Sequence, residues 1–157
     1  MTPRVLVTGA TGFIGRHAME ALRQREVDVH GVGHEVDLLG GEVRSLLQEI
    51  RPTHLLHLAW YAVPGEYWTS LENYRWVAAT IELARLFAES GGKRIVGAGT
   101  CAEGGPTPYG VCKDAARRLL ESFSRAAGVS FAWGRIFFVY GPGERPERVP
   151  ELRPRRG

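Results

Sequence analysis

The stretch Thr8-Gly-Ala-Thr-Gly-Phe-Ile-Gly15 decides how the chain begins to fold. It follows a buried strand predicted for Arg4–Thr8 and precedes a helix predicted for Phe13–Arg25, whose apolar residues recur at helical spacing. Glycines between a strand and a helix allow a sharp turn, let a pyrophosphate approach the backbone and leave N–H groups at the helix start to bind it. A glycine-rich loop without a ligand is the plainer interpretation. The coincidence of strand, turn and helix favours a dinucleotide site.

The rest of the chain alternates short β-branched runs with amphipathic stretches. The further predicted strands are Val27–Val32, Thr53–Ala59, Lys93–Gly99 and Ser130–Tyr140, and the further predicted helices are Glu42–Arg51, Leu71–Ser90 and Pro108–Ala127. This alternation is typical of the α/β class. It predicts a Rossmann-like doubly wound parallel sheet of five strands with helices on both faces, in three αβα layers.

Composition excludes several classes of protein. The 157 residues are 44% hydrophobic and 24% charged, as in ordinary globular domains. No apolar stretch approaches the roughly 20 residues that span a bilayer, and no signal segment opens the sequence, so we expect a soluble cytoplasmic protein without membrane contact. Two cysteines without a CxxC pattern indicate neither a disulfide framework nor a zinc site. His54 and His57 point to opposite faces of one predicted strand, so we expect no metal site.

The basic residues are concentrated near the C-terminus. Residues 144–157 contain five Arg, three Glu and three Pro, within a chain of net charge +3. We therefore expect residues 1–143 to form one domain and residues 144–157 to form a flexible Pro/Arg-rich tail. No basic helix or aromatic platform accompanies this tail, so we expect no nucleic-acid partner.

Tyr109 and Lys113 are candidates for acid–base chemistry. They lie four residues apart on a predicted helix and therefore share a face. An ammonium group near a phenol stabilises the phenolate and lowers its pKa from about 10, as a general acid or base requires. Thr100 follows the fourth predicted strand and can hydrogen-bond the same substrate oxygen. A packed tyrosine and a solvated lysine are the alternative interpretation.

Taken in order, these motifs resemble the extended short-chain dehydrogenase/reductase family, which includes NAD-dependent epimerases and dehydratases of nucleotide sugars. Thr8–Gly15 resembles the family's TGATGFIG turn, and Tyr109-Gly-Val-Cys-Lys113 resembles its Y-x-x-x-K motif. The other matching segments are Asp37-Leu38, His57-Leu-Ala-Trp60, Asn73 and Arg135-Ile-Phe-Phe-Val-Tyr-Gly-Pro142. The resemblance covers residues 1–143.

This resemblance implies an NAD(P)-dependent oxidoreductase that acts on a nucleotide sugar by hydride transfer. Tyr109 is then the acid–base group, Lys113 its electrostatic partner and Thr100 a hydrogen-bond donor. The implied cofactor is NAD or NADP, with a slight preference for NAD. The implied cofactor-binding residues are Thr8, Gly9, Thr11, Gly12, Phe13, Ile14, Gly15, Asp37, Leu38, Leu58, Ala59, Trp60, Asn73, Tyr109, Lys113 and Phe137. We also expect a homodimer through the long helices, with Trp76 and Phe87 on the packing surface.

Three features depart from the family pattern. Only eight residues separate Thr100 from Tyr109, no acid stands at Gly33-His34 to bind an adenosine ribose, and a C-terminal substrate domain is missing. The alternatives are therefore a catalytically silent dinucleotide-binding module or a truncated, non-functional family fragment. Four aromatic residues after the third strand can either stack on a ligand or cover an incomplete core, namely Trp60, Tyr61, Tyr67 and Trp68.

Overall fold

The computed structural model describes residues 2–144, in which five strands and four helices alternate without exception. Their order is β1 (Arg4–Thr8), α1 (Phe13–Arg23), β2 (Asp28–Val32), α2 (Glu42–Ile50), β3 (His54–His57), α3 (Glu72–Glu89), β4 (Arg94–Thr100), α4 (Pro108–Ala127) and β5 (Ser130–Ile136). Except at the end of β5, these bounds differ from the predicted ones by at most two residues. Except for Glu144, the predicted tail lies outside the described residues.

The strands form one parallel sheet in the order β2-β1-β3-β4-β5. β1 pairs on one edge with β2 and on the other with β3, and Thr8 is in register with both Val32 and His57. The chain first moves outward from β1 to β2 and then returns past β1 to β3. The strand order therefore reverses beside β1, where doubly wound sheets bind their ligands.

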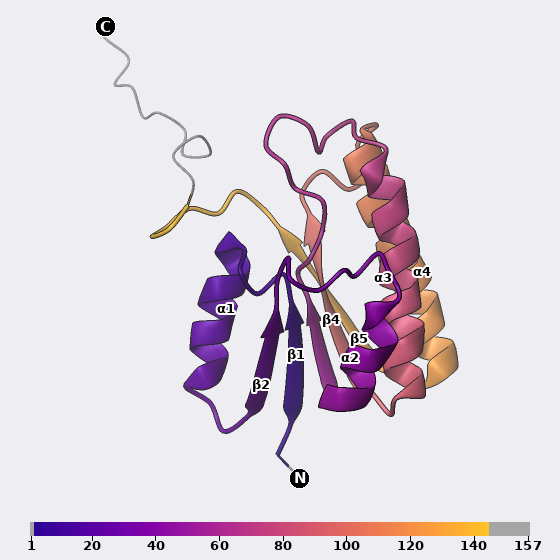
Figure 1. Ribbon diagram of the computed structural model, residues 1–157. Helices are drawn as coiled ribbons and strands as arrows, with labels where there is room; N and C mark the ends of the chain where they lie inside the picture. The colour runs from indigo at the N-terminus through magenta and orange to yellow at the C-terminus, as the bar shows by residue number, and fades with distance from the viewer. Residues whose placement is uncertain (1, 145–157) are drawn as a thin grey trace, which may run out of the picture.

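Helices cover both faces of the sheet. Figure 1 shows α1 on one side and α2, α3 and α4 on the other. Right-handed crossovers produce this division, because only the β1–α1–β2 unit runs towards the β2 edge, whereas all later units run towards β5. The predicted three-layer α/β fold is confirmed. Among the described residues, no helix is long and apolar enough to cross a membrane.

The main core lies between the sheet and the three helices on one face. Leu6, Leu55 and Ile95 from the strands meet Phe87 and Leu120 from the helices, and each is at most 2% exposed. Full burial of such side chains stabilises the fold by about 1.5–3 kcal/mol each. Phe87 is completely buried, so the expectation that it lies on a packing surface for a dimer is wrong.

β5 ends at Ile136, four residues before the predicted end at Tyr140. Ile136 pairs with Thr100, the last residue of β4, so no neighbouring strand continues beyond this point. The chain turns towards α1 instead, where Arg16 Nη2 donates to the Gly143 carbonyl at 2.7 Å. Phe137 is consequently 67% exposed.

Candidate cofactor site and active site

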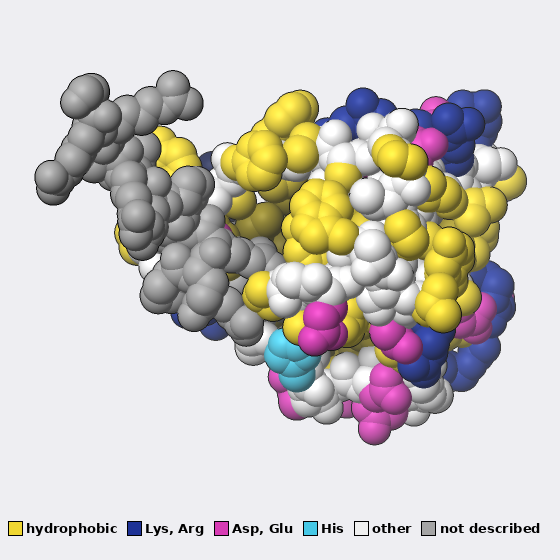
Figure 2. All heavy atoms as spheres, turned by 90° about the horizontal axis from the view of Figure 1, so that it is seen from above, with side chains coloured by type: hydrophobic (Ala, Val, Ile, Leu, Met, Phe, Trp, Pro, Cys, Tyr) yellow, Lys and Arg dark blue, Asp and Glu magenta, His cyan; other side chains and the backbone are white. Residues whose placement is uncertain are grey.

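The carboxyl ends of the strands meet at one edge of the sheet, where the loops after β1, β3, β4 and β5 come together. Figure 2 looks onto this edge and shows hydrophobic side chains gathered there. Exposed members from the loops after β3 and β5 include Trp68, Phe138 and Tyr140. An apolar surface at the ligand-binding edge of a doubly wound sheet is a candidate binding surface.

Three glycines shape the turn after β1. Gly9 has a φ of +71°, and a Cβ there would lie 2.8 Å from the Ala59 backbone nitrogen. A Cβ on Gly15 would lie 2.0 Å from the Gly9 carbonyl oxygen, and one on Gly12 would lie 3.2 Å from the same atom. The turn therefore needs glycine at position 9 for its left-handed backbone, and at positions 12 and 15 for close packing.

The start of α1 has the features of an anion-binding helix terminus. Gly12 is its N-cap and provides no side chain to bond the first N–H groups, and the first turn contains no acidic residue. Ile14 in that turn is 36% exposed, whereas the ring of Phe13 packs edge-on against His17 with centroids 5.3 Å apart. A helix N-terminus after such a turn attracts phosphate through its N–H groups and its dipole.

Thr8 joins β1 to β3 through its side chain. Its buried hydroxyl lies 2.7 Å from His57 Nδ1 and accepts a bond of 3.3 Å from the Ala59 N–H. On the other side of the ring, His57 Nε2 lies 2.9 Å from the Thr80 hydroxyl on α3. Burial lowers the pKa of His57 to about 3, so the ring is neutral at physiological pH. This chain of bonds fixes the floor of the site beside Leu58 and Ala59.

Glu35 reaches the end of β2, although Gly33-His34 contains no acid. Its Oε1 atom accepts a bond of 2.6 Å from the Gly33 N–H. A Cβ on Gly33 would lie 2.5 Å from the Thr11 hydroxyl and 2.8 Å from Glu35 Oε2, so the turn and the carboxylate meet at this glycine. The bond from Gly33 holds the pKa of Glu35 below its usual value. Glu35 stands three residues after the end of β2, and this position is the sequence signal that identifies it.

Asp37 and Leu38 have different surroundings. Leu38 is 7% exposed and belongs to the main core, so its side chain is not available at the surface. Asp37 is exposed, and its carboxylate accepts a bond of 2.9 Å from the Leu39 N–H. Of these two predicted cofactor-binding residues, only Asp37 presents a polar side chain to solvent.

Asn73 anchors the aromatic loop that follows β3. Its side chain is fully buried, and Nδ2 donates to the carbonyls of Tyr67 and Ser70 at 2.7 and 2.8 Å. Its Oδ1 accepts a bond of 2.8 Å from Trp60 Nε1. All three bonds are made to residues of the loop between β3 and α3, so Asn73 holds this loop in place.

Lys113 is buried beneath the Trp60 ring. The ammonium nitrogen lies 4.0 Å from the ring centroid and donates to the Ala98 carbonyl at 2.9 Å. Only 4% of the residue is exposed, and burial lowers its pKa to about 7. A desolvated cation over an aromatic face is stabilised by about 2 kcal/mol. The structure thus brings Lys113, Trp60 and Asn73 together.

Tyr109 begins α4 and packs against the same aromatic loop. Thr107 caps the helix by accepting a bond of 3.1 Å from the Gly110 N–H. The Tyr109 ring meets Tyr67 and Trp68 edge-on, with centroids 4.8 and 5.5 Å apart. The predicted acid–base tyrosine therefore lies at the aromatic surface of the site, whereas Lys113 lies one turn deeper.

Thr100 ends β4 and is 7% exposed. Its hydroxyl accepts a bond of 3.2 Å from the Ala102 N–H, and its own N–H donates to Glu103 Oε1 at 2.9 Å. Nothing in the local sequence distinguishes Glu103, because its side-chain partners Trp133, Arg135 and Arg117 come from other elements. Within residues 2–144, no group of three or more His, Cys, Asp or Glu side chains could hold a metal ion.

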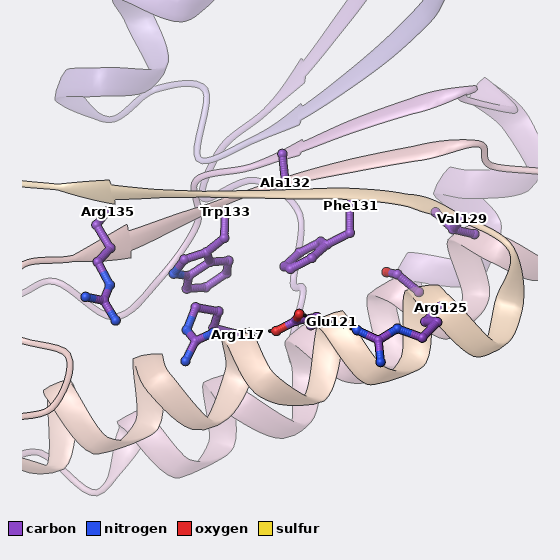
Figure 3. A pocket seen from close by; sticks show the side chains of 9 residues that line it. Arg117, Glu121, Arg125, Val129, Phe131, Ala132, Trp133 and Arg135 are labelled. Atoms are coloured by element: carbon purple, nitrogen blue, oxygen red, sulfur yellow. Dashed lines mark ion pairs between the residues drawn. The ribbon is translucent and has the colours of Figure 1, made fainter.

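A surface groove lies away from the glycine-rich turn, between α4 and β5. It has a volume of about 780 Å³. Figure 3 shows Trp133 and Arg135 of β5 and Arg117 of α4 pointing into it, while Ala132 points to the opposite face of the sheet. The glycine-rich turn does not line this groove, so the groove is separate from the candidate cofactor site.

The sequence from residue 5 to residue 155 matches the model of the NAD dependent epimerase/dehydratase family. The chain belongs to this family. Two epimerase/dehydratase relatives are dTDP-6-deoxy-L-talose 4-dehydrogenase (NAD(+)) of Aggregatibacter actinomycetemcomitans, 25% identical over 173 residues, and UDP-glucuronate 4-epimerase 6 of Arabidopsis thaliana, 27% identical over 192 residues. The matches cover 87% and 91% of this chain but only 62% and 41% of the relatives. The chain thus spans about half the length of the curated relatives that it matches.

Solved structures share the fold of this epimerase/dehydratase chain. MoeE5 in complex with UDP-glucuronic acid and NAD is 31% identical, with a TM-score of 0.73 over 92% of this chain and 57% of that one. The dTDP-4-dehydrorhamnose reductase of Bacillus anthracis in complex with NADP is 22% identical, with a TM-score of 0.75 over the same shares of the two chains. The second likeness concerns the fold alone.

Proposed function

We propose that this chain is the NAD(P)-binding part of an epimerase/dehydratase-type oxidoreductase that acts on a nucleotide sugar by hydride transfer. The glycine turn carries the proposal. Gly9 and Gly15 leave no room for a side chain, and the uncapped start of α1 lies at the reversal point of the sheet. This arrangement fits the pyrophosphate of a dinucleotide in both shape and charge.

When bound, a nicotinamide dinucleotide supplies the hydride acceptor and donor. The residues of this chain would bind it and move the proton. In the proposal, Tyr109 takes a proton from a sugar hydroxyl, or returns it, at the phenolic oxygen. The Lys113 ammonium one helical turn away favours the phenolate, and the Thr100 hydroxyl orients the reacting oxygen. Trp60 and Trp68 keep water from the deeper part of the site.

The names of the relatives support a nucleotide sugar as substrate. The dehydrogenase and the epimerase named above act on dTDP- and UDP-linked sugars, and MoeE5 was solved with UDP-glucuronic acid and NAD. The eight residues between Thr100 and Tyr109 leave little chain from this connection to contact a sugar. We therefore expect the aromatic loop after β3 to supply substrate contacts.

Glu35 supports NAD rather than NADP. A carboxylate at the end of the second strand binds the hydroxyls of the adenosine ribose in NAD and repels the additional phosphate of NADP. Its depressed pKa keeps Glu35 negatively charged at neutral pH. A cytoplasmic location is also part of the proposal, because Cys101 and Cys112 are both free thiols.

A catalytically silent dinucleotide-binding module is the second candidate. The packing of the aromatic loop favours it, because Trp60 covers Lys113 and both Tyr67 and Trp68 pack on Tyr109. A ligand that uses both polar groups has to displace these rings. In this alternative the glycine turn binds the cofactor without any turnover.

Calorimetric titration with NAD and NADP tests cofactor binding, which both candidate functions require. We expect binding that is weakened at least tenfold in Gly12→Ala, since the new Cβ would crowd the Gly9 carbonyl. Gly134→Ala is the matched control, because nothing lies within 4 Å of a Cβ at that position. No heat of binding to the folded wild-type chain would refute both candidates.

Turnover separates the two candidates. Nicotinamide absorbance is followed with dTDP-, UDP- and GDP-sugars in turn. A change with one of them that disappears in Tyr109→Phe supports the enzyme, whereas cofactor binding without any change supports the silent module.

A further inference from the structure

Glu103 is a completely buried carboxylate in the short connection between β4 and α4. Its side chain is 0% exposed. Oε1 accepts bonds of 2.9 Å from the Thr100 N–H and from Trp133 Nε1. Oε2 accepts a bond of 2.9 Å from Arg135 Nε and lies 3.6 Å from Arg117 Nε. The carboxylate thereby joins the end of β4 to β5 and α4.

The sheet provides the space for this carboxylate. A Cβ on Gly99 would lie 2.3 Å from Glu103 Oε1 and 2.2 Å from Trp133 Nε1. A Cβ on Gly97 would lie 2.4 Å from the same indole ring. Two glycines at alternate positions of β4 therefore let Trp133 lie flat on the strand and point its N–H at Glu103. A buried carboxylate is costly unless such partners are in place.

Lys113 is the other buried charge nearby, and the same indole lies next to it. The ammonium nitrogen is 5.9 Å from the centroid of the Trp133 ring. It donates to the Ala98 carbonyl, two residues before Thr100 on β4. Glu103 acts on Lys113 by charge, opposing the effect of burial.

Among residues 2–144, the other groups around Lys113 are neutral or already paired. From β3, the His57 ring is neutral, and from α3, Asn73 is an uncharged amide. On α4 itself, Asp114 is paired with Arg117 at 2.7 Å and with Arg118 at 2.8 Å.

We propose that Glu103 is a positioning residue of the candidate site, whose buried carboxylate holds the Thr100 backbone and supplies the counter-charge that keeps Lys113 an ammonium ion. The inference rests on the proposed function, because it gives Glu103 a role only if Lys113 serves Tyr109. On the other side of the carboxylate lie the guanidinium groups of Arg135 and Arg117.

The composition of the chain makes the test direct, because Lys93 and Lys113 are its two lysines and Lys93 is exposed. Labelling with ¹³C-lysine gives one Cε signal for each, and each signal is followed by NMR from pH 5 to 11. In Glu103→Gln we expect the acid dissociation constant of Lys113 to rise about tenfold or more, while that of Lys93 stays unchanged. The amide proton of Thr100 should also lose protection from hydrogen exchange.

Glu121→Gln is the matched control. It removes a carboxylate of α4, the helix that carries Lys113, and this carboxylate lies 3.5 Å from Arg117. The Lys113 titration should not change in this variant. If Glu103→Gln does not fold, Glu103→Asp shortens the side chain and keeps its charge, with an expected change of two- to threefold. A folded variant at position 103 with the wild-type Lys113 titration overturns the proposal.

This titration requires neither cofactor nor turnover, so its failure is distinct from failure of the proposed function. A changed Lys113 titration in a chain that binds no NAD or NADP would leave the Glu103–Lys113 coupling in place and remove its catalytic meaning. An unchanged titration in a chain that turns over a nucleotide sugar would reject Glu103 alone.

Discussion

Glu35 shows how one side chain can set the choice of cofactor. Its carboxylate accepts a bond from the Gly33 N–H at the end of β2, and the Thr11 side chain also lies against Gly33. Replacing it with glutamine removes the charge with little change in size. We expect Glu35→Gln to weaken NAD binding by about 1–2 kcal/mol, through the loss of charged hydrogen bonds, and to improve the relative affinity for NADP.

Paired calorimetric titrations with NAD and NADP measure this change. Glu26→Gln serves as control, because Glu26 is an exposed residue before β2 and should leave both affinities unchanged. Equal loss of NAD and NADP binding in Glu35→Gln would contradict a role in selectivity.

Because of Lys113, we expect the stability of the protein to change between pH 7 and pH 10. Its pKa falls from 10.5 to about 7 on folding, so between these values the unfolded chain binds more protons than the folded one. Stability therefore rises with pH across that window, by roughly 4 kcal/mol between pH 7 and 10. Lys113→Met has no such group.

We expect Lys113→Met to be more stable than the wild type at pH 7 by about 1–4 kcal/mol. This advantage should shrink as the pH rises to 10. Urea unfolding of both proteins at pH 7, 8.5 and 10 measures it, and parallel curves for the two proteins would contradict burial of the ammonium group.

At the level of elements, His57 connects β1, β3 and α3 through two hydroxyl groups. Its pKa falls from 6.5 to about 3 on folding, so the folded chain binds fewer protons between these values. Stability should therefore fall as the pH decreases from 6.5 to 4.5, by roughly 2–3 kcal/mol from this residue.

His57→Gln should be less stable than the wild type at pH 7, by about 1–3 kcal/mol, because the hydroxyls of Thr8 and Thr80 lose well-placed partners. The difference should narrow or reverse at pH 4.5. Chemical denaturation at the two pH values tests this, and a constant difference would show that His57 does not titrate in this range.

Most elements could be predicted from the sequence because their signals are local. The glycine turn, the helical spacing of apolar residues and the Thr107-Pro108 start of α4 each lie within a few neighbouring residues. The end of β5 is not a local property. Phe137 to Tyr140 continue the apolar run of the strand, but a strand ends where its partner ends, and β4 stops at Thr100.

The residues of the candidate site likewise fall into those with a local sequence signal and those without one. The sequence identified Gly9, Gly12 and Gly15, whose role follows from their place between a strand and a helix. Two residues were not identified from the sequence. The partners of Glu103 lie up to 32 residues away, and the Glu35 side chain folds back over two residues. Side-chain contacts of this kind depend on how elements pack, which residue spacing does not reveal.

For the whole molecule, cofactor binding should be visible as a gain in stability. A ligand that binds the folded chain alone stabilises it by about 2.7 kcal/mol at a concentration of 100 times its Kd. The preferred dinucleotide should therefore raise the Tm by several degrees in a thermal unfolding experiment. Gly12→Ala should lose most of this gain while keeping its own transition, and an unchanged wild-type Tm at saturating NAD and NADP would speak against a cofactor site.

The central place of β1 affects how the protein is made. It leaves the ribosome before the other strands of this sheet, yet it pairs on one edge with β3, whose residues are 54–57. A nascent chain that stops before this point has β1 and β2 but leaves one edge of β1 unpaired and Leu6 uncovered. An open apolar strand edge readily pairs with other chains. Until β3 is available to pair, this edge of β1 should therefore be a site at which the nascent chain benefits from a chaperone.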